Sequence, residues 1–188
     1  MNNNNPMPSN AKKVFQGEIF EVWQWEQKMF DGSVAIFERL KRPNTAQVIA
    51  IVGDKILIAT QEQPDKKPFP SLFGGRCEDG EDSLATAKRE LLEESGYISD
   101  DWFLWKEQNP VGKIEWTVHT YIARNCVFQQ PPKLDSGEKI ETHLLDFEEF
   151  LMLSEDQTFY EGELSKALLR TRFDQEFKRE FRQLLFGK

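Results

Sequence analysis

Strand-like hydrophobic runs fill the first third of the chain. Aromatic and β-branched residues are dense over residues 14–25, which predicts a strand. The pair Asp31-Gly32 is typical of a hairpin turn and predicts a second strand over residues 33–42. The clearest hairpin has nearly continuous apolar runs on either side of Gly53-Asp54, in the sequence QVIAIVGDKILIATQE. Such continuous hydrophobicity is typical of strands that are covered on both faces.

Helix-like spacing follows a Pro-rich segment, residues 63–75, which predicts a loop. A helix is expected over residues 83–94, because Asp82 or Ser83 can cap its start and Gly96 suits a left-handed cap at its end. The later pattern predicts strands over 102–108, 116–123 and 141–147, a short helix over 148–153 and one long amphipathic helix over 162–186. Together these elements predict an α/β fold, a sandwich of helices and a mixed sheet.

The composition limits the class of protein. Its 188 residues suit one domain with an extension, and 39% hydrophobic residues suffice for a core. A formal net charge of −8 argues against binding nucleic acid or an anionic membrane, which needs a basic surface. With only Cys77 and Cys126, no disulfide framework or structural zinc site is expected. Without a signal peptide or an apolar run of about 18 residues, a soluble cytoplasmic protein is expected.

Three glutamates stand close together in the sequence RELLEESGY. Glu90, Glu93 and Glu94 are spaced so that a helix places all three on one face. Carboxylates this close raise one another's pKa unless a cation lies between them. Carboxylate oxygens are the ligands that Mg²⁺ and Mn²⁺ prefer, and such ions usually meet substrate phosphates. A Glu-rich helix face is more often solvated surface, so the spacing alone does not establish a metal site.

The residues upstream of this run favour the metal site. Gly75, Glu81 and residues 89–97 fit the pattern G-x5-E-x7-R-E-U-x-E-E-x-G-U, where U is apolar, at every fixed position. On this segment, called the box below (residues 75–97), the chain resembles the Nudix hydrolases. The resemblance implies an α/β/α sandwich with a mixed β-sheet, in which the box forms a loop, a helix and a loop. It also implies a metal-dependent hydrolase acting on a nucleoside diphosphate linked to another group.

The resemblance assigns metal ligands to residues of the box. Glu90 and Glu94 match the principal ligands of Mg²⁺ or Mn²⁺, and Glu93 supports them or shares a metal ion. The carbonyl of Gly74, just before the box, matches a further ligand. These carboxylates would also help to activate the attacking water.

Other box residues are expected to support these ligands. Arg89 would orient the glutamates by ion pairing, since it lies four residues from Glu93. Glu81 would be a structural partner at the start of the helix. Gly75 and Gly96 are expected to serve backbone geometry.

The layout outside the box is most like the ADP-ribose pyrophosphatase branch, over residues 13–155. That branch splits ADP-ribose or similar nucleotide sugars into a nucleoside monophosphate and a sugar phosphate, and it often dimerises through N-terminal strands. The chain is therefore expected to bind such a small molecule and to form a homodimer. Its expected parts are a disordered tail (1–12), a β extension suited to dimerisation (13–45), a Nudix domain (46–155) and a C-terminal helical extension (156–188).

One departure from the branch leaves the general base open. The branch tends to read Asp-Glu-x-Glu where this chain reads DSGEKIE, so Ser136 replaces a carboxylate. A hydroxyl is no general base at neutral pH without an activator. The candidates for the base are then Glu138, Glu115 and a box glutamate, with Glu141 as a weaker candidate. Glu138 also keeps a ligand position.

A second departure leaves the substrate open. The branch commonly reads Arg-Gln-x-Arg after the core hairpin, and its arginines grip the diphosphate, whereas this chain reads ATQEQPDKK. Lys66, Lys67, Arg76 or Arg39 would have to compensate, although Arg is the better bidentate phosphate ligand. The sequence also leaves two other functions open, a nucleotide-sensing Nudix-fold module and a pyrophosphatase for nucleoside triphosphates.

Aromatic residues are further substrate candidates. Trp23 is the first of them, with Trp25, Phe37 and Trp116, because base–aromatic stacking contributes about 1–3 kcal/mol. Aromatic residues of strands more often form a core or a dimer interface. Together with Glu115, Arg39 and Arg76, Trp23 completes the predicted substrate-binding set.

Overall fold

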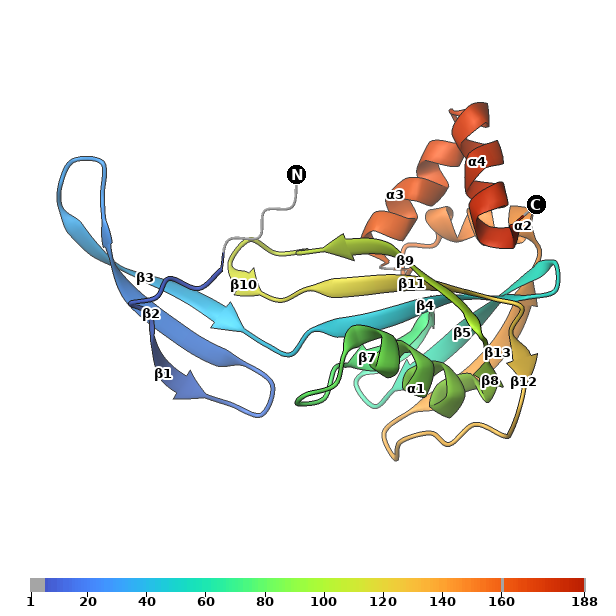
Figure 1. Cartoon of the computed structure of the whole chain (residues 1–188), viewed down its shortest axis with the longest axis horizontal. Helices are drawn as coiled ribbons and strands as arrows, with labels where there is room; N and C mark the ends of the chain where they lie inside the picture. The colour runs from blue at the N-terminus through green and yellow to red at the C-terminus, as the bar shows by residue number, and fades with distance from the viewer. Residues whose placement is uncertain (1–5, 160, 188) are drawn as a thin grey trace.

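The computed structural model describes residues 6–159 and 161–187 as a large mixed sheet, helices on its two faces and a smaller sheet beside it (Figure 1). The first five residues of the predicted disordered tail lie outside these ranges, and its last residue, Lys12, already begins a strand. The predicted α/β class with a mixed sheet is confirmed.

The smaller sheet projects from one end of the molecule and is called the arm below (Figure 1). Its order is β1 (Lys12–Gln16), β2 (Glu21–Lys28), β3 (Val34–Lys41) and β10 (Ile114–Glu115). The prediction of a single strand over 14–25 was wrong. The chain turns at Gly17, whose N–H donates to the carbonyl of Phe20 at 2.8 Å, and β1 then pairs antiparallel with β2.

The larger sheet has the order β13-β5-β4-β11-β9. β4 (Thr45–Val52) pairs antiparallel with β5 (Lys55–Gln63) and parallel with β11 (Val118–Arg124), which confirms the hairpin at Gly53. β9 (Asp101–Gln108) and β13 (Lys139–Leu145) complete this order. The strand expected over 116–123 is present as β11 but begins two residues later, at Val118, after the chain has left β10 of the arm.

The Pro-rich segment 63–75 was predicted as a loop, and this was wrong. It contains β6 (Lys66–Ser71), which pairs with β5, and β7 (Phe73–Arg76), which pairs with β4. β6 lies at the margin of the sheet, off its main path. Pro68 and Pro70 are two residues apart, so both can turn their nitrogens to the open side, where no ladder hydrogen bond is lost.

Helices cover both faces of the larger sheet (Figure 1). α1 (Ser83–Ser95), the predicted box helix, packs on one face, and a two-stranded sheet of β8 (Tyr97–Ile98) and β12 (Val127–Phe128) follows it. The other face carries α2 (Phe147–Met152), a 3₁₀ turn (Leu153–Glu155), α3 (Gly162–Thr171) and α4 (Gln175–Phe186). The single long helix expected over 162–186 is divided, because Asp174 caps α4 by accepting from the N–H of Phe177.

Two hydrophobic clusters correspond to these two faces. One joins alternate residues of β4 such as Ile49 to α2, α3 and α4, and the other joins Ala46 and Val48 to Leu91 of α1. β4 is therefore buried on both faces, as its continuous hydrophobicity predicted. No helix in the described ranges is long and apolar enough to cross a membrane.

Candidate active site

α1 holds the acidic residues of the box in a fixed frame. Asp82 caps its start by accepting from the N–H groups of Leu84 and Ala85, both at 2.9 Å. Gly96 ends it in the left-handed conformation (φ 76°), and a side chain there would collide with the carbonyl of Gln130. The expectation that Gly96 serves backbone geometry agrees with this position.

Arg89 lies at the centre of the cluster and contacts three carboxylates. It donates to both oxygens of Glu81 at 3.1 Å, to Glu90 at 2.8 Å and to Glu93 at 3.1 Å. It also donates to the carbonyl of Arg76 at 3.3 Å. The hydrogen bonds from Arg89 lower the pKa of Glu81 to about 2. Arg89 thus ties the loop of the box to the helix, as its expected orienting role requires.

Glu94 is the most buried of the box glutamates. Only 4% of its surface is exposed, and its Oε2 accepts from the N–H of Gly74 at 2.8 Å. Burial raises its pKa to about 8, against the opposing effect of that hydrogen bond, and the charges of Glu90 and Glu138 raise it further. Burial also raises the pKa of Glu90. A carboxylate in such a position is stabilised in its charged form only when a cation comes close.

The two glycines before the helix leave space that side chains would fill. A Cβ on Gly75 would occupy the position of the Glu90 carboxylate, and one on Gly74 would collide with the backbone of Ala46 and Gln47 in β4. The expectation that Gly75 serves backbone geometry was wrong, since its backbone lies outside the left-handed region. Glycine at this position leaves the space that the end of the Glu90 side chain occupies.

The acidic residues line one cavity of about 560 Å³, called the box pocket below. Besides the box residues, Glu138 lies here, as its expected ligand position requires. Asp135 and Lys133 line it too and were missed by the sequence analysis, although Asp135 is the first residue of the DSGEKIE loop and Lys133 lies two residues before it. Arg76, a predicted substrate residue, is at the same pocket.

The segment 129–138 is fastened to the end of α1. The N–H groups of Gln129 and Gln130 donate to the carbonyl of Gly96 at 2.9 and 3.3 Å, and the N–H of Lys133 donates to the carbonyl of Glu93 at 2.7 Å. These bonds use carbonyls at the end of the helix that would otherwise lack partners. They place the acidic loop beside the box.

Three predicted substrate residues do not line the box pocket. Glu115 lies in β10 of the arm, where its carboxylate accepts from the N–H of Met7 at 2.8 Å and pairs with Lys41 at 3.0 Å. Trp23 donates to Glu21 at 2.7 Å, also in the arm. Arg39 lies over the ring of Trp25 at 5.5 Å and lines a separate pocket. Of the four predicted substrate residues, only Arg76 lies with the carboxylates of the box pocket within one copy of the chain.

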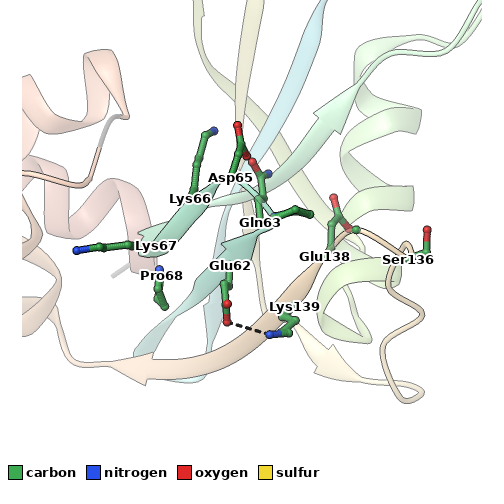
Figure 2. Close-up of a pocket in the computed structure, with 11 residues that line it drawn as sticks. Glu62, Gln63, Asp65, Lys66, Lys67, Pro68, Ser136, Glu138 and Lys139 are labelled. Atoms are coloured by element: carbon green, nitrogen blue, oxygen red, sulfur yellow. Dashed lines mark hydrogen bonds and ion pairs between the residues drawn. The ribbon is translucent and has the colours of Figure 1, made fainter.

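A second cavity, of about 610 Å³, adjoins the box pocket, because Gln63 and Glu138 line both. Figure 2 shows Glu138 and Ser136 on the loop beside α1, opposite the β5–β6 hairpin. Glu62 and Lys139 pair across its floor at 3.2 Å, and the side chain of Lys67 points away from Glu138 (Figure 2). Neither Lys66 nor Lys67 lines the box pocket, so neither lies among the predicted metal ligands.

The donor set of the box pocket fits a hard divalent cation. Carboxylates gather there, and the buried Glu94 accepts a single hydrogen bond of 2.8 Å from Gly74. As they stand, the described side chains include no cluster of three acidic, histidine or cysteine residues close enough to hold a metal ion. The carboxylates of Glu90 and Glu93 accept hydrogen bonds from Arg89. Rotation of these two side chains would return their oxygens to a cation.

Comparisons with known proteins agree with this architecture. The NUDIX domain model matches residues 41–167. The ADP-ribose pyrophosphatase of Bacillus subtilis (strain 168) is 25% identical over 161 residues, which cover 84% of this chain and 87% of that protein. A methanol dehydrogenase activator of Bacillus methanolicus is 24% identical over 157 residues, 81% of this chain and 84% of that one. The crystal structure of an ADP compounds hydrolase has the same fold, with a TM-score of 0.73, 21% identity and coverage of 93% and 95%.

Proposed function

The chain belongs to the Nudix family, and we propose on that premise that it hydrolyses the pyrophosphate linkage of a nucleoside diphosphate joined to a second group. ADP-ribose or a similar nucleotide sugar is the proposed substrate, which the similarity to an ADP-ribose pyrophosphatase supports. The observation that carries the proposal is the box pocket, where four glutamates, Arg89 and the acidic loop converge.

The proposed cofactor is Mg²⁺ or Mn²⁺, held by Glu90, Glu93, Glu94, Glu138 and the carbonyl of Gly74. When bound, such an ion polarises a phosphoryl oxygen and favours the ionisation of water. Glu94 is positioned for this role by burial and by the N–H of Gly74, while Glu90 and Glu93, which accept hydrogen bonds from Arg89, would turn toward a bound cation. The chemistry of these oxygen donors suits both ions.

The proposed general base is Glu138. It lies in the same pocket as the box glutamates, whereas Glu115 lies in the arm and is already paired with Lys41. Glu138 would take the proton of the water that attacks one phosphorus, as the bond from that phosphorus to the bridging oxygen breaks. The products would be a nucleoside monophosphate and the phosphorylated second group.

A substrate panel tests the proposal. The protein would be incubated with Mg²⁺ and with ADP-ribose, nucleotide sugars, dinucleotides and nucleoside triphosphates, and the released products measured. We expect turnover of a diphosphate-linked substrate that chelation with EDTA abolishes. Turnover of the triphosphates alone would replace the substrate assignment with the housecleaning alternative.

We also propose that the arm forms a homodimer. Val14 and Phe15 of β1 and Val34 and Ile36 of β3 are large apolar side chains that remain more than half exposed. Val14 and Ile36 line one surface hollow of the arm, and exposed apolar side chains that gather in this way are typical of interaction surfaces. Sedimentation of the wild type and of Phe15→Ser with Ile36→Ser would show a dimer and its loss, and a monomeric wild type would refute this proposal.

A second candidate function is regulatory binding without turnover. The similarity to a protein named as a methanol dehydrogenase activator favours it, together with Ser136 in place of an expected carboxylate. Tight nucleotide binding with no turnover of any panel member would support this candidate and refute the hydrolase.

A further inference from the structure

Arg42, which directly follows β3, lies against two aromatic rings. Its guanidinium lies 4.5 Å from the ring centroid of Trp116 and 5.7 Å from that of Phe20. Trp116 is itself fixed, because its Nε1 donates to the hydroxyl of Thr45 at 3.0 Å. Aromatic rings on a guanidinium leave its edge, with the N–H donors, as the part that can bind a ligand.

The edge of this guanidinium lacks a protein partner. The Nε of Arg42 is buried and makes no hydrogen bond within the described ranges. No ion pair joins Arg42 to any described carboxylate. A buried donor without a hydrogen-bond partner is destabilising, and more so when it is charged, so the unpaired Nε of Arg42 requires an explanation.

Arg76 places a second cation beside it. Arg76 lies opposite Thr45 in the β4–β7 pairing, and the N–H of Cys77 donates to the carbonyl of Asn44 at 2.9 Å. The pKa of Arg42 is lowered by burial and by the positive charge of Arg76. Two like charges held together by the fold repel each other unless an anion lies between them.

This pair lies at the rim of the box pocket. Arg76 and Pro43, the neighbour of Arg42, both line that pocket. Side chains alternate along a strand, so Arg76 projects from the face of β7 opposite to Gly75 and the Glu90 carboxylate. An anion bound by the pair would therefore sit beside the carboxylates and not among them.

The charge of the box pocket favours such a contact. Seven carboxylates line it against three cationic side chains, Arg76, Arg89 and Lys133. In this structure Arg89 is paired with Glu81, Glu90 and Glu93. A bound divalent cation would offset part of the negative charge, and cationic side chains at the rim would add to the attraction of an anionic diphosphate.

We propose that Arg42 and Arg76 form a two-arginine grip for a phosphate group of the substrate at the rim of the box pocket. The inference rests on the proposed hydrolase function and deepens it by naming the residues that hold the diphosphate. It explains how the chain manages without arginines in ATQEQPDKK: the cations come instead from the end of β3 and from β7. The ligand class is a phosphate ester or diphosphate oxygen bound by guanidinium edges.

The test compares Arg42→Met and Arg76→Met with Arg179→Met, which removes the same charge from an exposed position of α4. With ADP-ribose and Mg²⁺, each of the first two should lower kcat/KM by about 10- to 100-fold, mainly through KM, because the grip acts before and during the reaction. The Mg²⁺ concentration for half-maximal activity should not change, because the metal ligands remain. Arg179→Met should behave as the wild type.

Arg42→Lys keeps the charge and loses the planar fork, so it should recover only part of the activity. If Arg42→Met does not fold, Arg42→Lys and the exposed Arg76→Met decide the result. Wild-type kcat/KM in both Arg42→Lys and Arg76→Met would overturn the grip while leaving the hydrolase intact.

A binding assay separates this inference from the proposed function. Calorimetric titration of the metal-free protein with ADP should give an affinity that is at least about 10-fold weaker in Arg42→Met and Arg76→Met than in the wild type. If the wild type turns over no substrate, the proposed function fails and this titration still tests the grip. Equal behaviour of wild type and variants, including no binding by any of them, would refute it.

Discussion

Replacing Glu94 with glutamine should make the metal-free protein more stable at neutral pH. Glu94 is 4% exposed, and burial raises the pKa of its carboxyl from 4.5 to about 8. Between these values the folded protein keeps a proton that the unfolded chain has lost. The stability that the Glu94 carboxyl contributes is therefore complete below its pKa in the unfolded chain. It is lost as the pH rises through its pKa in the folded protein.

The size of the effect follows from the two pKa values. At about 1.4 kcal/mol for each pKa unit, the difference between 4.5 and about 8 gives a ceiling of about 5 kcal/mol above that range. At about pH 7 the same reasoning gives about 3 kcal/mol, or about 6–12 °C in Tm for a chain of this length. Glutamine carries no charge at any pH, and its side-chain carbonyl can still accept from the N–H of Gly74.

Thermal unfolding in EDTA at about pH 5 and about pH 9 measures this difference, because stability depends on pH through the group that titrates. The Tm of Glu94→Gln should exceed that of the wild type clearly at the higher pH and only slightly at the lower. Glu141→Gln, at an exposed position of β13, is the matched control. A Tm difference that is the same at both pH values would refute the reasoning.

Addition of Mg²⁺ should reverse the order. A ligand that binds only the folded state stabilises it in proportion to the logarithm of its concentration, so the wild type should gain more than the variant. Glu94→Gln should also lose Mg²⁺-dependent turnover although it folds. A variant that gains as much Tm from Mg²⁺ as the wild type would contradict the role of Glu94 as a ligand.

Three further substitutions test other parts of the site. Gly75→Ala should weaken Mg²⁺ binding by at least about 10-fold in calorimetry, with little change in Tm. The reason is that the new methyl group displaces only the flexible end of Glu90, a proposed metal ligand. Unchanged affinity for Mg²⁺ would contradict this. Gly96→Ala should lower the free energy of unfolding in urea by about 1–3 kcal/mol. The alanine would be strained in the left-handed conformation, and its Cβ would meet the carbonyl of Gln130. A smaller loss of stability would contradict this prediction. If Glu138 is the general base, Glu138→Gln should lower kcat by about 100-fold or more with little change in KM. A pH–rate profile of the variant that keeps the acidic limb of the wild type would show that a group other than Glu138 is the base.

The sequence was most informative where a residue acts through its own backbone or its immediate neighbours. The helix of the box was predicted closely because Asp82 and Gly96 determine its two ends locally. The same kind of signal was present at Asp174, which caps α4, but the amphipathic pattern on both sides of it predicted one continuous helix. Gly17 likewise divides a run whose composition favours one long strand.

Features that depend on distant partners could not be predicted. β6 is a strand because β5 lies beside it, although its prolines favour a loop. Asp135 and Lys133 reach the box pocket only because the segment that carries them is bonded to the end of α1. Arg42 drew no attention in the sequence, since its relation to Trp116 and Arg76 exists only after the arm and the larger sheet have met.

The fastening of the segment 129–138 to α1 has a consequence for how this protein can diversify or be engineered. Gln129, Gln130 and Lys133 are bound through their backbones, so their side chains can change without loss of the attachment. Ser136 and Gly137 are exposed at the tip of the same segment, where the N–H of Glu138 donates to the carbonyl of Asp135 at 3.0 Å, so substitutions at the tip that keep its length keep Glu138 in place. Libraries of substitutions at side chains of this segment, at constant length, could therefore alter substrate preference while the backbone attachment to α1 is kept.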